Sequence, residues 1–388
     1  MRDTRVQRPS LEGLARAAKA LLPYLLLVAL TVPTIYWAFR SDDLRDLGSF
    51  LASGALASEG KNAYAPNHPL VFRPEFVDWP SVDAVNLNPP AFLWLFTLLA
   101  RGEPLGVGRC WRIVTVGLYI VSVVLLARAY PRLSTPLGVT WALAFPGLWH
   151  TVDTAQVYAL ILLGLVLALL WMEQGHDVAA GVMLGVLASL KPNLALVIAA
   201  LLVWRCRRLV FASAVAALIA NGVTAAKFGW SVYADWLEAT RVYGPAMVLL
   251  PANASLAGLT SRLGVPQLGV ALIAILLILT VYWIMTHRPQ RQMVAEVAVL
   301  VSLLVSPLTW SGYMVLTLPM FARWRWTRLV TASAVVLTIP FWIIIWLQGA
   351  QPVVRVLVYW MRGWGLVLLW CSLFETPRRS ESSEQRGA

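Results

Sequence analysis

Residues 21–39 read LLPYLLLVALTVPTIYWAF, an apolar run without a charged side chain. As a helix, a run of this length covers about 30 Å, the thickness of a bilayer's hydrocarbon core. Similar runs lie at 112–127, 154–172, 209–226, 266–286, 292–305, 329–347 and 356–374, and shorter ones at 89–100, 137–149, 178–190, 192–204 and 312–322. The sequence predicts an all-α polytopic membrane protein with roughly 12 transmembrane helices.

The composition excludes an ordinary soluble enzyme. Of the 388 residues, 59 % are hydrophobic and 13 % are charged, against about 45–50 % and 25 % in soluble domains. Lysine and arginine number 31 and the acids 19, which leaves a net charge of +12. In a membrane protein such an excess lies in cytoplasmic loops and sets the orientation of the helices. We therefore expect a lipid bilayer, and no nucleic acid, as a partner.

The basic residues also predict the orientation. If the basic segment 1–20 is cytoplasmic, alternating spans place further basic groups on the same side, at 205–208, 288–291, 323–328 and 378–379. This agreement predicts one membrane domain at 21–374 and a disordered cytoplasmic tail at 375–388. Arginine outnumbers lysine, as in GC-rich bacterial genomes. The same topology places Cys110, Cys206 and Cys371 near the cytoplasmic face.

Three polar segments then face outward, at 40–88, 228–265 and 306–313. The first contains seven of the 19 acids. Within it, Leu44, Leu47, Leu51 and Ala55 recur at helical spacing, which predicts an amphipathic helix lying on the membrane surface. The second begins FGWSVYADWLEATRVYG (228–244), rich in the aromatic residues that settle at headgroup level. It predicts a second surface-lying helix.

A series of motifs follows in a distinctive order. They are DLGSFLASGALASEGKNAY (46–64), NLNPPAFLWLF (86–96), AQVYALILLGLVLALL (155–170), AAGVMLGVLASLKPNLALVIAALLVWRCRR (179–208), NASLAGLTSRL (253–263) and SPLTWSGYMVL (306–316). Their order and spacing resemble glycosyltransferase family 87, multispanning transferases of the C-type fold that include polyprenyl-phosphate-mannose-dependent α-mannosyltransferases. The similarity extends from about residue 40 to residue 320.

The resemblance implies an activity on the extracytoplasmic face of a bacterial plasma (inner) membrane. A hexose, with mannose the leading expectation, would pass from a polyprenyl phosphate to a lipid or glycan acceptor, with inversion and with an aspartate of the first outer loop as base. A carboxylate can remove the proton of an acceptor hydroxyl as the bond forms. Cationic side chains can stabilise the departing phosphate. No nucleotide is released, so neither a glycine-rich nucleotide loop nor another cofactor is expected.

The resemblance places the catalytic aspartate at Asp46, with Asp43 as the next candidate. Asp42, Asp43 and Asp46 have an alternative role, because aspartate is favoured at the start of a helix and these residues precede or open the predicted surface helix.

Lys191 is the leading candidate for the donor phosphate. It interrupts an apolar stretch, and a charge within a membrane segment is by default a functional hypothesis. If the apolar halves on either side are short helices, Lys191 lies at the tip of a hairpin. The alternative is a lysine whose ammonium group reaches the membrane interface. Arg262 and Arg45 are further phosphate candidates.

Five residues are candidates for substrate binding: Tyr64, Asn88, Gln156, Trp310 and Tyr313. Each has a simpler interpretation. Asn88 precedes two prolines that suit a helix start, Asp153 can cap a helix beside Gln156, and the tyrosines can be interface anchors. In family 87 the tryptophan is often followed by histidines, whereas here Trp310 is followed by Ser-Gly-Tyr.

No metal is expected, because His68, His150, His176 and His287 form no ligand pattern and no Asp-x-Asp pair is present. Two other classes of function remain open. A transporter or flippase of a lipid-linked sugar would often show paired broken helices in two similar halves, whereas only one Lys-Pro break, at 191–192, is evident. The other class is an inactive scaffold of an envelope assembly.

Overall fold

The computed structural model describes residues 11–40, 44–66, 85–340, 342–343 and 352–375. These residues form helices and connecting segments, without a strand. In chain order the elements are α1 (Leu11–Arg40), α2 (Arg45–Ser58), η1 (Pro90–Phe92), α3 (Leu93–Leu99), α4 (Pro104–Ala129), α5 (Pro136–Ala144), α6 (Pro146–Asp153), α7 (Tyr158–Glu173), α8 (Asp177–Leu190), η2 (Pro192–Leu194), α9 (Ala195–Val203), α10 (Arg207–Phe228), α11 (Ser231–Val248), α12 (Leu256–Arg262), α13 (Pro266–His287), α14 (Arg291–Val305), η3 (Ser311–Thr317), α15 (Leu318–Arg323), α16 (Arg328–Thr338), α18 (Pro352–Tyr359), α19 (Met361–Cys371) and η5 (Ser372–Phe374).

Four helices in the described part of the chain are long and apolar enough to cross a membrane. They are the stretch Ala18–Arg40 of α1, together with α4, α10 and α13. Several shorter apolar helices pack among them, including α7, α8 and α19. The all-helical membrane fold expected from the sequence is therefore confirmed, although many segments are shorter than a full span.

Prolines account for several of these short segments. Phe145, Lys191, Ser306 and Ile339 each precede a proline, and each has an extended backbone at the end of a helix. The proline ring disfavours the helical conformation in the preceding residue. The predicted run 137–149 is therefore divided before Pro146, and helix α16, at the start of the predicted run 329–347, ends at Thr338.

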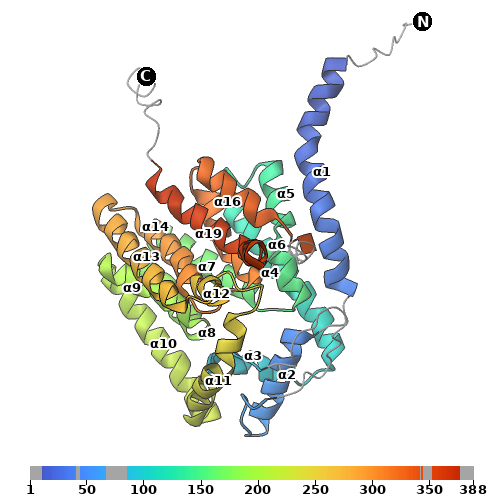
Figure 1. Cartoon of the computed structure of the whole chain (residues 1–388). Coiled ribbons are helices and arrows are strands. Elements are labelled where there is room, and N and C mark those ends of the chain that lie inside the picture. Colours follow the sequence, from blue (N-terminus) through green and yellow to red (C-terminus); the bar gives the residue numbers. More distant parts are fainter. Residues whose placement is uncertain (1–10, 41–43, 67–84, 341, 344–351, 376–388) are drawn as a thin grey trace, which may run out of the picture.

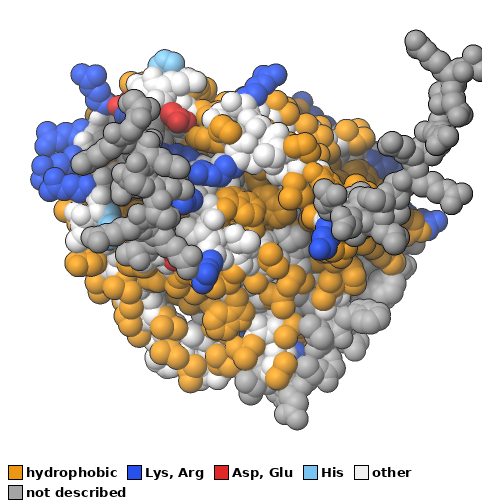
Figure 2. Space-filling view, turned by 90° about the horizontal axis from the view of Figure 1, so that it is seen from above, with side chains coloured by type: hydrophobic (Ala, Val, Ile, Leu, Met, Phe, Trp, Pro, Cys, Tyr) orange, Lys and Arg blue, Asp and Glu red, His pale blue; other side chains and the backbone are white. Residues whose placement is uncertain are grey.

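The basic connections between helices lie together at one end of the bundle, which we call the basic end. Arg291 opens α14 and pairs with Asp177 of α8, with 2.5 Å between Nη1 and Oδ1. The same two side chains act electrostatically on Cys206, in the α9–α10 connection. Figure 1 shows the start of α1 and the end of α19 on this side, and Figure 2, seen from above, shows lysine and arginine side chains around it.

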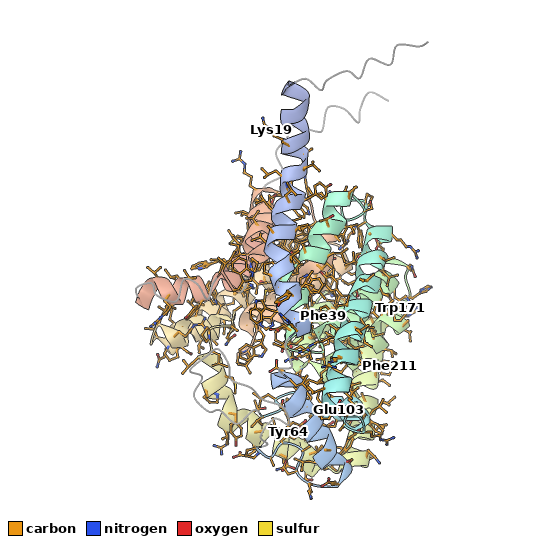
Figure 3. The ribbon with its side chains drawn as sticks, turned by 90° about the vertical axis from the view of Figure 1, so that its right-hand side faces the viewer. Lys19, Phe39, Tyr64, Glu103, Trp171 and Phe211 are labelled. Carbon is orange, nitrogen blue, oxygen red and sulfur yellow. The ribbon has the colours of Figure 1, made fainter. Side chains whose placement is uncertain are left out.

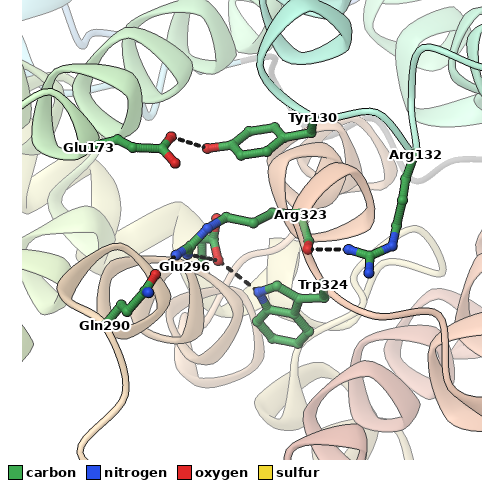
Figure 4. Close-up of polar contacts among 7 residues, drawn as sticks. All are labelled: Tyr130, Arg132, Glu173, Gln290, Glu296, Arg323 and Trp324. Carbon is green, nitrogen blue, oxygen red and sulfur yellow. Dashed lines mark hydrogen bonds and ion pairs between the residues drawn. The ribbon is translucent and has the colours of Figure 1, made fainter. Parts of the chain in front are cut away.

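A buried polar cluster joins several helices at the basic end (Figure 4). The carboxylate of Glu296 on α14 accepts hydrogen bonds from Arg323, at 3.1 Å, and from the indole of Trp324, at 2.7 Å. Arg323 also donates to Gln290 at 2.6 Å, and its carbonyl accepts from Arg132 at 2.7 Å. The cluster fixes the start of α14 against the end of α15 and the α4–α5 connection.

At the opposite end, α2 packs tightly on α3 and α4. Leu47 and Leu51 of α2 are buried, and the Phe50 and Phe96 rings stack with centroids 4.7 Å apart. A side chain at Gly54 would overlap the Phe96 carbonyl, so glycine permits this close approach. The predicted helix is thus present, but its apolar side is buried against protein rather than left for the lipid.

The α4 helix starts at this same end. Gly108 packs against Leu44, which precedes α2. Cys110, in the second turn of α4, therefore lies at the end opposite Cys206, and the expected location of Cys110 beside the basic connections is wrong. Figure 3 shows Tyr64 and Glu103 at this end and Lys19 at the far end of α1. The helix predicted from 228–244 is present as α11.

Helices α8 and α10 pack closely against each other. Gly181 and Gly185 lie one turn apart on α8 and face the α10 backbone at Leu209 and Ser213. A methyl group at either glycine would overlap a carbonyl oxygen of α10. Such small-xxx-small spacing is a standard way for membrane helices to approach closely. This contact holds the end of α8, and therefore Lys191, in place.

Candidate active site

Asp46 lies in the first turn of α2, and its carboxylate is held by Gln156. Nε2 of Gln156 donates to Oδ2 of Asp46 at 2.7 Å, across 110 positions of the chain. Leu44 directly precedes α2, and no side chain caps the helix there. The Asp46 carboxylate is therefore directed toward Gln156 in the bundle and does not cap α2. The positive end of the helix dipole favours a carboxylate at this position.

Gln156 is positioned by a short connection between α6 and α7. Ala155 adopts a left-handed backbone with φ of 50°, which is costly for a residue with a side chain. Two neighbours on α4 hold this turn. The indole of Trp111 donates to the Gln156 carbonyl at 3.3 Å, and Arg112 donates to the Val152 and Asp153 carbonyls at 3.2 Å each. The connection is thus a fixed element.

Asp153 does not cap the following helix, because α7 begins after Val157 without a side-chain cap. The alternative interpretation of the Asp153–Gln156 pair is therefore wrong. Oε1 of Gln156 is buried and has no hydrogen-bond partner among the described residues. Gln156 therefore retains an acceptor beside the Asp46 carboxylate.

Lys191 lies at the tip of a helical hairpin, as the sequence predicts, between α8 and η2. Its side chain is 8 % exposed. The ammonium group donates a hydrogen bond to the Tyr313 hydroxyl and lies 4.4 Å and 5.2 Å from the ring centroids of Tyr313 and Tyr158. Two aromatic faces thus stabilise the cation within the protein. A lysine that extends to the interface does not match this environment.

Tyr158 connects the two halves of the site. It is buried, begins α7 two residues after Gln156, and its ring lies 4.3 Å from that of Tyr313 between centroids. The Asp46 carboxylate interacts electrostatically with its phenol. Gly312 allows the contact, because a methyl group there would overlap the Tyr158 ring. Asp46, Gln156, Tyr158, Lys191 and Tyr313 form one group, which we call the Asp46–Lys191 cluster.

Tyr64 and Asn88 form a second contact at the same end. The Tyr64 hydroxyl donates to the Asn88 carbonyl at 2.9 Å, and the Asn88 side chain donates to Asn86 at 3.1 Å. Burial raises the pKa of Tyr64 well above its usual value, so its hydroxyl remains a donor. The prolines after Asn88 begin η1 and α3, so the expected helix start is confirmed. These contacts of Tyr64 and Asn88 support the chain locally.

Arg262 and Trp310 lie on two segments that are hydrogen-bonded to each other. Arg262 donates to the carbonyls of Leu250, at 2.6 Å, and Asn253, at 3.0 Å. Asn253 in turn accepts from the Thr309 backbone at 3.0 Å, next to Trp310. Burial lowers the pKa of Arg262 to about 10, which leaves it charged at neutral pH. Arg262 thus stabilises the 250–253 turn, and Trp310 precedes η3, which carries Tyr313.

Two predicted residues cannot be placed. Asp43 lies outside the described residues, and Arg45 begins α2 with a side chain that is likewise outside the description. Among the described residues there is no group of three or more metal-binding side chains.

The sequence interpretation missed Trp111, Arg112 and Tyr158. Arg112 carried a usable signal, because it is a charge within an apolar segment, like Lys191. Trp111 and Tyr158 carried none, since each lies in a run where an aromatic residue is an ordinary core residue.

Comparison with known families matches residues 86–307 to the glycosyltransferase family 87 model. A search of curated proteins finds no match. The matched region includes Asn88, Gln156, Lys191 and Arg262, whereas Asp46 and Tyr313 lie outside it and join the site through the contacts above. Because the match covers more than half of the chain, this protein belongs to glycosyltransferase family 87 and is a membrane enzyme that transfers a sugar from a donor to an acceptor.

Proposed function

We propose that this enzyme transfers a hexose, with mannose the first choice, from a polyprenyl phosphate to a lipid or glycan acceptor. The reaction takes place on the extracytoplasmic face of a bacterial plasma membrane. One observation carries the proposal: the Asp46 carboxylate and the Lys191 ammonium group are brought together, through Gln156, Tyr158 and Tyr313, at the end remote from the basic connections. A base and a phosphate-binding cation are the two groups that this reaction requires.

Asp46 acts as the general base. The acceptor oxygen attacks the anomeric carbon of the donor sugar while its proton passes to the Asp46 carboxylate. The bond between the anomeric carbon and the phosphate oxygen breaks, and its electron pair leaves with the polyprenyl phosphate. The sugar carbon is inverted. Gln156 donates to one carboxylate oxygen at 2.7 Å and so orients the other toward the acceptor.

Lys191 acts at the departing phosphate. An ammonium group has three donors, and Tyr313 accepts one of them. The remaining donors bind phosphate oxygens, where negative charge develops as the donor bond breaks. Tyr158 and Tyr313 hold the cation without cancelling its charge, since an aromatic ring is neutral.

A groove beside Lys191 suits an isoprenoid chain. It has a volume of about 280 Å³ and lies between α3, α8 and α10, with Trp94, Val186, Leu190, Ile219 and Val223 among its lining residues. Leu190 directly precedes Lys191. An apolar chain in this groove would therefore place its phosphate near the ammonium group.

The architecture is proposed to be that of the C-type fold, with roughly 12 crossings formed by α1, α4, the α5–α6 pair, α7, α8, α9, α10, α13, α14, the η3–α15 pair, α16 and α19. They constitute the single membrane domain at 21–374. This alternation supports the proposed topology because it returns every basic connection to the same end.

The decisive experiment is transfer by the full chain in lipid, with labelled polyprenyl-phosphate mannose and an acceptor extract. Asp46→Asn should reduce transfer by about 10²–10⁴-fold, the usual contribution of a general base. An asparagine oxygen can still accept from Gln156, so the variant should fold normally. Transfer at the rate of the natural enzyme in Asp46→Asn would overturn the assignment.

The matched control is Glu59→Gln. Glu59 lies at the other end of α2, exposed and paired with Lys61 at 2.6 Å. Its neutralisation should leave transfer unchanged. The same vesicles can report movement of intact donor across the bilayer, and such movement without transfer would favour a flippase instead.

A further inference from the structure

Arg362 is a charged residue that the proposed reaction leaves unused. It lies in the first turn of α19 and is 3 % exposed. Its Nε and Nη1 atoms are buried and have no hydrogen-bond partner among the described residues. Removing a guanidinium from water without a partner is strongly unfavourable. The arrangement is therefore that of a cation whose counter-ion is a ligand.

The beginning of α19 reinforces the positive charge. Trp360 precedes the helix without a side-chain cap, and the first turn contains no acidic residue. The amide groups of a helix start carry a partial positive charge and bind anions. Arg362 adds a full charge at this same point, where a cation is disfavoured unless an anion is bound.

The neighbourhood connects this position with the Asp46–Lys191 cluster. The Trp360 indole donates to the Ser255 carbonyl at 2.9 Å. Ser255 and Asn253 bind the 306–313 segment, because the Ser255 hydroxyl donates to the Pro307 carbonyl at 3.0 Å and the Thr309 amide donates to Asn253, also at 3.0 Å. That segment continues to Tyr313, the partner of Lys191.

A second arginine, Arg262, binds the turn that leads into Ser255. Nη1 and Nη2 of Arg262 bind carbonyls of the 250–253 turn, while its Nε is buried without a partner. Arg262 thus binds the 250–255 loop directly, and Arg362 lies two residues after Trp360, which binds the same loop. Both arginines have buried N–H groups without a hydrogen-bond partner among the described residues. A phosphate, with several acceptor oxygens, matches this excess of donors.

We propose that Arg362, with the first turn of α19, binds the phosphate group of a lipid. The inference rests on the proposed function for its choice of lipid substrates, but its physical basis is the unpartnered charge. Arg362 lies beyond the region that matches the family model. The phosphate is supplied either by the polyprenyl phosphate or by an anionic phospholipid.

The test compares binding and stability of the full chain, delipidated in a neutral detergent. Polyprenyl phosphate and phosphatidylglycerol are the two probes, and polyprenol, which lacks phosphate, is the control. In the natural protein a phosphate lipid should raise the melting temperature, and polyprenol should raise it less. Arg362→Gln should weaken phosphate-lipid binding at least tenfold and should melt no lower than the natural protein when lipid is absent, because it removes an uncompensated charge.

Arg355→Gln is the matched control, since Arg355 is exposed on the adjacent helix α18. It should bind both probes like the natural protein, and Arg362→Lys should retain part of the binding. A tenfold loss with either probe supports the site and identifies the source of the phosphate. Unchanged binding of both probes by Arg362→Gln overturns it. The site is also overturned if Arg362→Gln fails to fold, or melts at a lower temperature than the natural protein without lipid, because Arg362 would then be structural.

Asp46→Asn separates this proposal from the proposed function. If both are correct, it loses transfer and keeps phosphate-lipid binding. Normal transfer in Asp46→Asn combined with weak binding in Arg362→Gln would overturn the reaction alone.

Discussion

The proposed binding of the donor phosphate by Lys191 can be measured through the donor KM. A charge-assisted hydrogen bond is worth about 1.5–3 kcal/mol, or roughly 10- to 100-fold in affinity. We expect Lys191→Met to raise the donor KM by that factor, because methionine fills the space beside the Tyr158 and Tyr313 rings but carries no charge. Steady-state kinetics with varied donor would measure it.

Tyr313→Phe is the companion variant. It removes the hydroxyl that accepts from Lys191 and keeps the aromatic face under the ammonium group. Its effect on the donor KM should be smaller than that of Lys191→Met. An unchanged donor KM in Lys191→Met would contradict the phosphate role.

At the scale of single residues, the sequence identified unusual charges but not their partners. Asp46 and Lys191 were recognisable because each departs from its surroundings or resembles a family motif. Their contacts depend on positions 110 and 122 residues away in the chain. Gln156 was expected to bind sugar, whereas the structure shows it beside the carboxylate, held by a strained Ala155. Such an arrangement has no local sequence signal.

At the scale of helices, the α8–α10 contact depends on glycine. We expect Gly185→Ala to destabilise the protein, because its methyl group would overlap the Ser213 carbonyl. Overpacking of this kind costs roughly 1–3 kcal/mol. Thermal unfolding of the purified protein in detergent would measure it.

Gly222→Ala offers the opposite case on the same pair of helices. Gly222 lies within α10, and a methyl group there meets nothing within 4 Å. This variant should be neutral or slightly more stable, because alanine favours a helix more than glycine does. Equal loss of stability in both variants would show that close packing is not the cause.

Helix positions were predictable where hydrophobicity alone decides them, as for the predicted run 266–286, observed as Pro266–His287. The points at which helices are interrupted were harder to predict. The predicted span 154–172 begins only at Tyr158, and the run 356–374 is divided at Trp360. Neither break contains a proline, and the sequence stays largely apolar across each of them. Tertiary contacts therefore determine where the helix starts.

At the scale of the whole molecule, the orientation can be tested with engineered thiols. In a cysteine-free background, Glu59→Cys lies at the exposed end of α2, and Arg208→Cys lies exposed in the first turn of α10 at the basic end. A membrane-impermeant thiol reagent added to intact cells should label the first, while the second requires permeabilised cells. The reverse pattern would place the Asp46–Lys191 cluster on the cytoplasmic side.

The separation between Asp46 and the polar cluster around Glu296 has a bioenergetic consequence. Between these two ends, α14 contributes a series of buried side chains that is apolar except for Ser302 and includes Val297, Leu300 and Leu304. With the proposed orientation, the acceptor proton taken up by Asp46 returns to the external water from which the acceptor came. The glycosyl transfer would then move no net charge across the membrane, and its rate would be independent of the proton-motive force.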